Sequence, residues 1–464
     1  MLLSRLQLLS KNPVQNRGIL SFFLGFLLIY VLLLVYLREQ CFRDPSSAFF
    51  RPERARVLSY SAFRQTQGRK FAEQAALHAP LKWAPDTSND DKKNNDDNDK
   101  HAGDDGGIGQ QEPLQPDVCI GIGSVDRHGF SYLKETLGSV LEGLDAAERR
   151  RVYVVVFLAH SNQSVHEDYN KPWLRNMADA LPTYAQDNET LALIRRLEIA
   201  NDYPAHARKQ KIDFSVLLSE CAKVNPRYTM TLEDDVIAVD GWYHRTLAAV
   251  KNAAQKTEEL GRDGFLYLRI FYDGRLLGWN SEEWLSYFGG SILFVVAELA
   301  VLSFIRWRFQ AVRRAVPILF ILLIAGVCTP MLIGLFFASG RSCMLPKRPG
   351  VSLMQKYGCC GQGLVFPQQQ VVDHLLPMYA NTTDDHAAVD TFLEDWANAR
   401  DSLRFAVTPV LIQHVGGKSS HGVGDQVAGK LTDDMPFDYM FETNEPVKLA
   451  MEHQAFVDGL RTAS

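Results

Sequence analysis

The sequence has no excess of charge of one sign that would point to a polyanionic partner. Its 49 Lys and Arg residues stand against 54 Asp and Glu residues, which gives a formal net charge of −5 at pH 7. A nucleic-acid-binding domain carries a basic patch or stripe, so this composition gives no reason to expect nucleic acid as a partner. The 464 residues, 46% of them hydrophobic, fit a globular core combined with membrane segments.

A complete dinucleotide-binding fingerprint is also missing. Gly121-Ile122-Gly123 lies in an apolar stretch, but the third glycine of the motif is absent and the charged Asp126-Arg127-His128 follows. Ser124 and Arg127 nonetheless stand at the exit of the first predicted strand. Because this is the usual position of nucleotide contacts in α/β proteins, we predict that both residues bind a nucleotide-containing donor substrate.

No clear small-residue cleavage site follows the first long apolar run, residues 18–37. This run has 20 uncharged residues, enough to cross a bilayer, and Arg5, Lys11 and Arg17 precede it. A cleaved signal peptide is the alternative, but the run is long for one. We predict an uncleaved transmembrane anchor preceded by a cytosolic tail of residues 1–17.

Two further apolar runs lie inside the chain, at residues 284–305 and 315–339. The loop between them, 306–314, has four arginines and no acid, which predicts a cytosolic loop within a transmembrane hairpin, 284–339. Buried helices of a soluble core are the alternative, but an arginine-rich turn does not fit a core. Glu298 interrupts the first run, and we expect it to face another helix because a carboxylate in lipid is costly.

With three spans, everything from residue 38 to 283 and from 340 onward is predicted to be lumenal. Three glycosylation sequons agree with this, at Asn162, Asn188 and Asn381. Of seven cysteines, Cys328 falls in the third apolar run, which leaves six for disulfides in an oxidising lumen: Cys41, Cys119, Cys221, Cys343, Cys359 and Cys360. Six cysteines allow fifteen pairings, so the connectivity stays open, and free core thiols are the alternative for Cys119 and Cys221.

Two segments of different composition separate the anchor from the first strand. Residues 38–85 are predicted to form a lumenal stem with some helical character over residues 55–76. Residues 86–117 are rich in Asn, Asp, Lys and Gly, with hardly any apolar residue, so they cannot bury enough surface to order themselves. We predict a disordered acidic linker, with a calcium-binding loop as the alternative.

Alternating strand and helix patterns begin at Val118 and predict an α/β fold with a mostly parallel sheet. Removal of the hairpin leaves 118–283 and 340–464, enough for one domain of ordinary size, so the hairpin is predicted to split a single domain. The expected strands are residues 118–125, 152–159, 228–232, 265–271, 364–366 and 405–413, and the expected helices include residues 132–144, 213–224 and 391–401.

Three carboxylates in a row, Glu233-Asp234-Asp235, end the strand at 228–232. Clustered acids at the carboxyl edge of a sheet bring together the oxygens that hard cations prefer. Such a cation neutralises the diphosphate that leaves a nucleotide-sugar, which suggests a sugar-nucleotide enzyme. A solvated turn is the alternative. His414 ends another predicted strand. A neutral imidazole at this position is a competent ligand for ions such as Mn²⁺, and a purely structural histidine is the alternative.

Several of these motifs resemble the landmarks of a known enzyme group. They are Arg127, Tyr132-Leu133-Lys134-Glu135-Thr136-Leu137-Gly138-Ser139-Val140, Leu232-Glu233-Asp234-Asp235 and Gln413-His414-Val415-Gly416 with Ser419-Ser420. Together they resemble the N-acetylglucosaminyltransferase IV group of GT-A-fold enzymes.

A second resemblance is closer. The hairpin after Leu276-Leu277-Gly278-Trp279-Asn280-Ser281-Glu282-Glu283-Trp284, the vicinal Cys359-Cys360 with Gly361-Gln362-Gly363 and the single N-terminal anchor resemble the post-GPI-attachment to proteins factor 4 family. This resemblance implies a Golgi membrane enzyme with a GT-A fold that transfers N-acetylgalactosamine from UDP-GalNAc to the first mannose of GPI-anchored proteins. A galactosyl or glucosaminyl donor would use the same landmarks.

The same resemblance implies roles for the acidic triplet. Glu233 and Asp234 are expected at the donor diphosphate, and Asp235, Asp234 and His414 at Mn²⁺ or another divalent cation. The implied reaction inverts the sugar and needs a base on the acceptor side, for which Asp390 is the first candidate and Asp373 and Glu394 are the others. An ordinary N-cap aspartate is the alternative for Asp390.

Two other functions remain open at this point. One is a lumenal transferase that moves another UDP-sugar onto N-glycans, and the other is a non-catalytic membrane factor that binds a glycolipid. The hairpin argues against the first, because an acceptor already anchored in membrane lipid gains most from a site held at the bilayer surface. The intact acidic triplet and His414 argue against the second.

Overall fold

The computed structural model describes residues 13–83, 115–127, 129–200, 202–354, 358, 360–382, 386–417 and 435–463. The chain forms two compact units. Unit 1 comprises Met1–Val57 and Gly274–Lys347, and unit 2 comprises Leu58–Asp273 and Arg348–Ser464. Most of the predicted linker, residues 86–114, lies outside the described residues, as do Cys359 and Ser419-Ser420.

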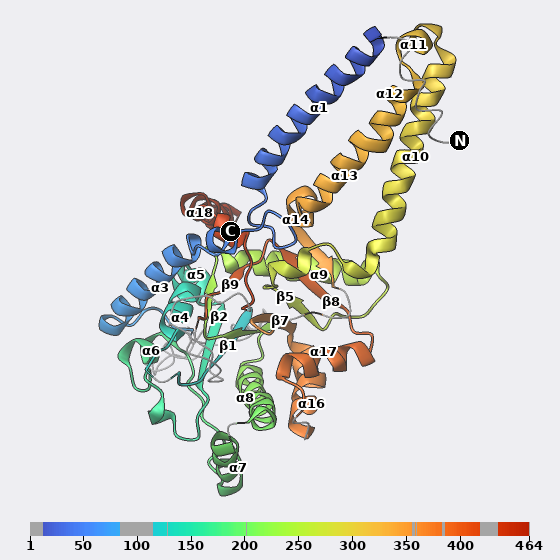
Figure 1. Cartoon of the computed structure of the whole chain (residues 1–464). Helices are drawn as coiled ribbons and strands as arrows, with labels where there is room; N and C mark the ends of the chain where they lie inside the picture. The colour runs from blue at the N-terminus through green and yellow to red at the C-terminus, as the bar shows by residue number, and fades with distance from the viewer. Residues whose placement is uncertain are drawn as a thin grey trace, which may run out of the picture. The chain divides into compact units, whose positions relative to one another are not determined.

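A mixed seven-stranded sheet forms the centre of unit 2, in the order β2-β1-β3-β7-β5-β8-β6 (Figure 1). The pairs β1–β2, β1–β3 and β5–β8 are parallel, whereas β7 and β6 run antiparallel to their neighbours. Five strands therefore share one direction, which confirms the α/β prediction with its mostly parallel sheet. A second sheet pairs β4 with β9. The strands are β1 Val118–Ser124, β2 Val152–Leu158, β3 Tyr228–Glu233, β4 Val236–Ala238, β5 Tyr267–Arg269, β6 Gly350–Leu353, β7 Gly363–Pro367, β8 Arg404–Thr408 and β9 Ile412–His414.

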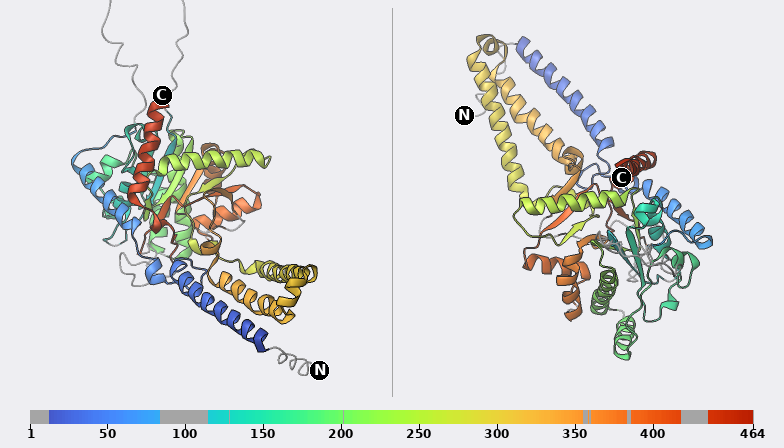
Figure 2. Two further views of the ribbon diagram at one scale, coloured as in Figure 1. Left: turned by 90° about the horizontal axis from the view of Figure 1, so that it is seen from above. Right: turned by 180° about the vertical axis from the view of Figure 1, so that it is seen from behind.

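Helices cover both faces of this sheet. Figures 1 and 2 show α8, α16 and α17 on one side and α9 on the other. The α-helices of unit 2 are α3 Tyr60–Leu77, α4 Leu133–Leu141, α5 Ala146–Arg149, α6 Pro172–Met177, α7 Asn188–Ala200, α8 Tyr203–Lys223, α9 Trp242–Glu259, α15 Gln368–Gln370, α16 Leu376–Asn381, α17 Val389–Ala399 and α18 Pro446–Ala463. Shorter turns are η2 Gln163–Val165, the π-helix η6 Val371–Leu375 and η7 Phe441–Thr443.

Two apolar clusters fix α8 against the sheet. In the first, Leu218 of α8 packs with Phe366 of β7 and with Leu393 of α17. In the second, Leu217 and Cys221 of the same helix pack with side chains of β1 and β2. Because successive strand residues point to opposite faces, β1 and β2 present apolar side chains to both layers, and this explains why both strands are buried and largely apolar along their length.

The helix expected within the stem is present as α3, but it belongs to unit 2. It packs on α4 through two glycines, and a Cβ built on Gly138 would lie 2.1 Å from the carbonyl oxygen of Gly68. Glu442 accepts hydrogen bonds from the backbone N–H groups of Ser59 and Ser61 at the start of α3. Of the predicted stem, residues 38–85, the part from Leu58 onward therefore belongs to the sheet-containing unit.

One predicted strand is divided in two. Residues 405–413 were expected to be continuous, but β8 ends at Thr408 and β9 begins at Ile412. Pro409 lies between them and has no N–H to donate to a ladder, and the last ladder pairs of β8 are Ala406 with Arg269 of β5 and Thr408 with Gly350 of β6. The break lets β9 leave the large sheet and pair with β4 instead.

The described part of unit 1 contains three helices that are long and apolar enough to cross a membrane, within Arg17–Gln40, Gly274–Arg308 and Ile318–Ala338. Figure 2 shows these long helices again from two further sides. Glu298 accepts a hydrogen bond of 3.0 Å from the Thr329 hydroxyl, so it faces the neighbouring helix as expected. The elements are α1 Pro13–Gln40, η3 Gly274–Leu277, η4 Ser281–Glu283, α10 Trp284–Arg308, α11 Gln310–Ala315, α12 Ile318–Leu323, the π-helix η5 Ile324–Cys328, α13 Thr329–Ala338 and α14 Arg341–Met344, and a short α2, Pro52–Ala55, precedes unit 2.

Two disulfides that join described cysteines resolve part of the open cysteine pairing. Cys41 is bonded to Cys343 in unit 1, and Cys119 is bonded to Cys221 in unit 2. The alternative of free core thiols at Cys119 and Cys221 is therefore wrong. Cys328 is free and buried. Disulfides form and persist in oxidising compartments, which agrees with the location predicted for both segments.

Candidate active site

The acidic triplet lies where two sheets meet. Glu233 ends β3, Asp234 and Asp235 form the turn, and β4 follows at once. In the small sheet Val236 is paired with His414, and the Val415 N–H donates to the Asp235 carbonyl at 2.9 Å. The pairing of β4 with β9 therefore brings a histidine from 179 residues further along the chain beside the carboxylates.

The Asp234 carboxylate is hydrogen-bonded to other side chains of the protein. Both of its carboxylate oxygens accept from Arg127, at 2.6 and 2.7 Å, and the Ser124 hydroxyl also donates to it. All three side chains are buried. Burial lowers the pKa of Arg127, but the charges of Asp234 and Asp235 outweigh this and raise it, so the guanidinium stays charged. The carboxylate thus holds Ser124 and Arg127 at the exit of β1.

His166 extends this network and was missed in the sequence. Its Nδ1 accepts the Asp168 N–H at 3.1 Å, so the proton must be on Nε2, which lies 2.9 Å from the Ser124 hydroxyl oxygen. Burial lowers the pKa of His166, in agreement with a neutral ring. His166 lies in a polar stretch without periodicity, and no local pattern marks it.

Glu233, Asp235 and His414 form the group suited to a metal ion. Each offers a ligand atom, and these atoms lie within 4.8 Å of one another. Sequence reasoning had assigned the metal to Asp235, Asp234 and His414. Because Asp234 is bound by Arg127, Glu233 is the residue that completes the observed group.

The donor set fits a divalent cation such as Mn²⁺, which accepts carboxylate and imidazole ligands. Asp235 Oδ1 is buried and has no hydrogen-bond partner, while Oδ2 lies 3.4 Å from His414 Nε2. A Cβ built on Gly416 would lie 2.2 Å from Asp235 Oδ2 and 2.9 Å from His414 Nε2, so only glycine leaves this space open. The residues present therefore suit a bound cation.

Charge coupling within the group is strong. Burial and then the neighbouring Asp235 raise the pKa of Glu233 to about 8. Burial would raise the pKa of Asp235, but His414 holds it below its usual value, and Asp235 in turn raises the pKa of His414 against the opposing effect of burial. A bound cation would stabilise the ionised form of carboxylates brought together in this way.

A cavity of about 240 Å³ adjoins the triplet. Its walls come from the ends of β1 and β3, from α8 and from the first turn of α17. The lining includes Arg127, Glu233, Asp234, Phe214, Gly361 and Asp390. Gly361 lies between two acids, because a Cβ built on it would be 3.7 Å from Glu233 Oε1 and 3.8 Å from Asp390 Cβ.

The three candidate bases differ sharply in their surroundings. Asp390 lines the cavity and accepts the Thr391 N–H at 2.7 Å. Ala388, not Asp390, is the N-cap of α17, so the N-cap alternative for Asp390 is wrong. Glu394 is buried and ion-paired to Arg269 and Arg404, whereas Asp373 is exposed on η6 and does not line the cavity.

The sequon asparagines of unit 2 are accessible where the structure describes them. Asn162 and Asn188 are exposed, Asn162 just before η2 and Asn188 as the first residue of α7. Asn381 ends α16, and its side chain is outside the described residues.

Comparison with known proteins identifies the class, since the matching curated proteins are glycosyltransferases. Alpha-1,3-mannosyl-glycoprotein 4-beta-N-acetylglucosaminyltransferase C of Sus scrofa is 33% identical over 128 residues, 26% of this chain and 27% of that protein. The A form of Mus musculus is 26% identical over 215 residues, 44% of this chain and 33% of that protein. The chain thus spans about a third or less of these relatives.

The family follows from a longer match. The model of the family described as GPI-N-acetylgalactosamine transferase PGAP4 matches residues 118–413, well over half of the 464 residues. The chain belongs to this family, and the resemblance drawn from the sequence is confirmed.

Proposed function

We propose that this protein is an inverting GT-A glycosyltransferase that transfers N-acetylgalactosamine from UDP-GalNAc to the first mannose of the GPI glycan on GPI-anchored proteins. The observation that carries the proposal is the cavity that adjoins Arg127, the acidic triplet and Asp390 in a chain of this family. The mixed seven-stranded sheet supports the GT-A fold.

Arg127 lines the donor end of the cavity, and Ser124 donates to the same Asp234 carboxylate as Arg127. Asp234 fixes the Arg127 guanidinium through two hydrogen bonds, so that its charge is positioned before a diphosphate arrives. Phe214 and Leu217 of α8 supply an apolar wall that suits the nucleoside. Preorganised charge of this kind acts on the negative charge that develops on the leaving group.

Glu233, Asp235 and His414 would hold Mn²⁺ or another divalent cation. When bound, the cation neutralises charge on the diphosphate. Asp390 accepts the proton of the attacking mannose hydroxyl, which requires an ionised carboxylate on the acceptor side. Its place across Gly361 from Glu233 supports this role.

The membrane arrangement favours a Golgi enzyme with a lumenal catalytic unit. Cys41 follows α1 and Cys343 follows α13, and their disulfide requires both ends on one side of the membrane. Arg306, Arg308, Arg313 and Arg314 then lie on the cytosolic side. Asn162→Gln and Asn188→Gln should together reduce the glycosidase-sensitive gel shift, and protease cleavage of the arginine loop only after the lumen is opened would contradict this topology.

The decisive test is a comparison of GPI glycans from cells with and without this chain. Cells lacking it should lose the N-acetylhexosamine branch on the first mannose, and re-expression of the wild-type chain should restore the branch while Asp390→Asn does not. Unchanged GPI glycans combined with altered N-glycans would favour the other transferase. Restoration of the branch by Asp390→Asn would refute the proposed base.

A further inference from the structure

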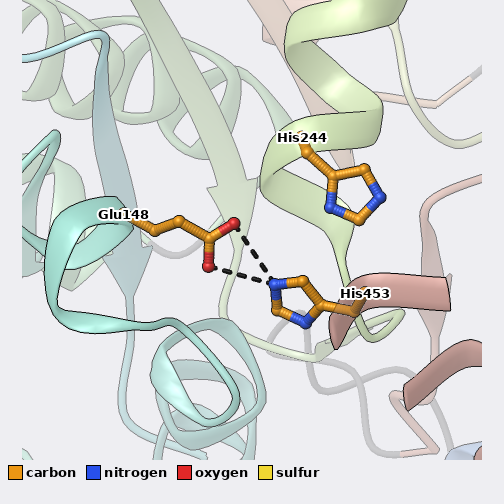
Figure 3. Close-up of side chains that lie close together, drawn as sticks. All are labelled: Glu148, His244 and His453. Atoms are coloured by element: carbon orange, nitrogen blue, oxygen red, sulfur yellow. Dashed lines mark hydrogen bonds and ion pairs between the residues drawn. The ribbon is translucent and has the colours of Figure 1, made fainter. Parts of the chain in front are cut away.

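A second group of metal-binding side chains lies in unit 2, away from the cavity. Glu148 of α5, His244 of α9 and His453 of α18 each offer a ligand atom, and these atoms lie within 4.8 Å of one another. Figure 3 shows the three side chains converging from three helices. His453 lies beyond residue 413, where the match to the family ends.

His453 is held from both sides of its ring. Its Nδ1 lies 2.7 Å from Asp240 Oδ1, and its Nε2 lies 3.0 and 3.2 Å from the two oxygens of Glu148. Glu148 is itself fixed, because its Oε2 accepts the Asp145 N–H in a capping box at 3.1 Å. Among the described residues, the other oxygen of Glu148, Oε1, has a hydrogen bond only with His453.

The His244 ring gives a second indication of a bound ligand, independent of the His453 contacts. Its Nδ1 is buried and has no hydrogen-bond partner, and Figure 3 shows a ring nitrogen turned toward Glu148 and His453. Phe456 stacks on the ring at 4.3 Å. Gly241, with a φ of +72°, makes the space for it, since a Cβ there would lie 2.4 Å from His244 Cε1.

An ion pair explains only part of this arrangement. A protonated His453 between Asp240 and Glu148 would satisfy those three residues, and these contacts raise the pKa of His453 to about 9. It would leave His244 Nδ1 buried and unsatisfied, which is unfavourable.

We propose that Glu148, His244 and His453 form a structural binding site for Zn²⁺ or a similar divalent transition metal. Two imidazole nitrogens and one carboxylate oxygen are a known zinc ligand set that leaves the fourth tetrahedral position to water, and calcium and magnesium prefer oxygen ligands alone. Asp240 takes the outer position on His453 Nδ1 that carboxylates occupy behind zinc-bound histidines. Zn–N and Zn–O bonds of ~2.0–2.2 Å space the ligand atoms by about 3.4 Å, within the observed spread.

The metal would join α18 to α5 and α9. Outside this group, Arg245 and Glu452 form a partly exposed ion pair at 2.6 Å, which contributes little by itself. The site would therefore fix the C-terminal helix within unit 2, and it is independent of the reaction proposed above.

The test uses the full-length chain carrying Asp235→Ala, so that the active-site group no longer competes for metal. Metal is first removed with a chelator and the chelator is removed. After Zn²⁺ is added back, this host should retain one equivalent of it through gel filtration and should unfold at a higher temperature than without Zn²⁺. Co²⁺ should give the visible absorption of a tetrahedral site. When His244→Phe is introduced into the same host, Zn²⁺ retention, the rise in unfolding temperature and the Co²⁺ absorption should all be lost. The phenylalanine can still stack on Phe456, and the hydrogen bonds of His453 are unchanged.

Asp240→Asn is the second variant, and it should weaken Zn²⁺ binding by tenfold or more while all three ligands remain. If His244→Phe does not fold, Asp240→Asn and His244→Gln carry the test. Absence of Zn²⁺ binding by the host, or equal binding by the host and the His244 variants, would overturn the proposal and leave an ion pair only.

Discussion

Two acids on α17 allow one chemical change to be compared in opposite settings. Asp390 and Glu394 lie four residues apart, and each can be converted into its amide without a change of size. Asp390 lines the cavity, whereas Glu394 is 5% exposed and lies between Arg269 and Arg404. We expect Asp390→Asn to affect catalysis alone and Glu394→Gln to affect stability first.

The magnitudes follow from the contacts. An asparagine at 390 can still accept the Thr391 N–H, and position 390 is not the N-cap of α17, so the melting temperature should not change. Loss of a general base lowers the transfer rate about 10²–10⁴-fold, equivalent to about 3–5 kcal/mol in the barrier. Glu394→Gln leaves two buried guanidinium groups without their carboxylate, a change that costs about 3–5 kcal/mol of folding free energy.

The assay measures both quantities on the same preparations. Transfer from UDP-GalNAc to a GPI-glycan acceptor gives the rate, donor titration gives Kd and thermal unfolding gives Tm. Asp390→Asn should keep the donor Kd and the Tm, and Glu394→Gln should lower the Tm by roughly 10 °C. Near wild-type transfer by Asp390→Asn would refute the role of Asp390, and a stable but inactive Glu394→Gln would make Glu394 the candidate base.

Three further outcomes are expected. Asp235→Ala should fold but lose metal-dependent donor turnover and bind the donor more weakly, and full activity of this variant in chelator would contradict the active-site group. Gly138→Ala should lower the free energy of unfolding by more than 2 kcal/mol in denaturant titrations, because its Cβ would meet the Gly68 carbonyl, whereas Gly459→Ala, with open space around it, should be neutral or slightly stabilising. Burial raises the pKa of Asp438 from 3.8 to about 6, so the folded state binds more protons and stability should fall as pH rises between these values. Asp438→Asn should remove up to ~3 kcal/mol of this total loss of stability, and identical pH profiles of the wild-type and variant proteins would show that Asp438 is not its source.

Local patterns predicted the elements that carry the site. The strand ending in Glu233 and the strand ending in His414 were both recognisable from apolar runs that stop at polar residues. That these two residues meet depends on the pairing of β4 with β9, which joins distant segments. The resemblance to a known family supplied this juxtaposition, and periodicity alone could not.

Side-chain direction within the triplet could not be predicted. Three consecutive acids gave no sign that Asp234 would bind Arg127 and Ser124, since this depends on where the β1 exit lies relative to the turn. The same holds for α3, which lacks a strong apolar face and packs through the backbones of Gly68 and Gly138. Contacts made by backbone atoms leave almost no trace in a hydropathy pattern.

The Cys41–Cys343 disulfide has a consequence for the order of biosynthesis. The two cysteines are 302 residues apart, and three apolar helices lie before the second one. Cys41 must therefore wait as a thiol until the whole intervening chain has been made and Cys343 has been delivered to the same compartment. Closure of the bond then marks a chain in which the third of these apolar helices has been made. A cut anywhere between the two cysteines leaves the N-terminal anchor covalently attached until a reductant is added.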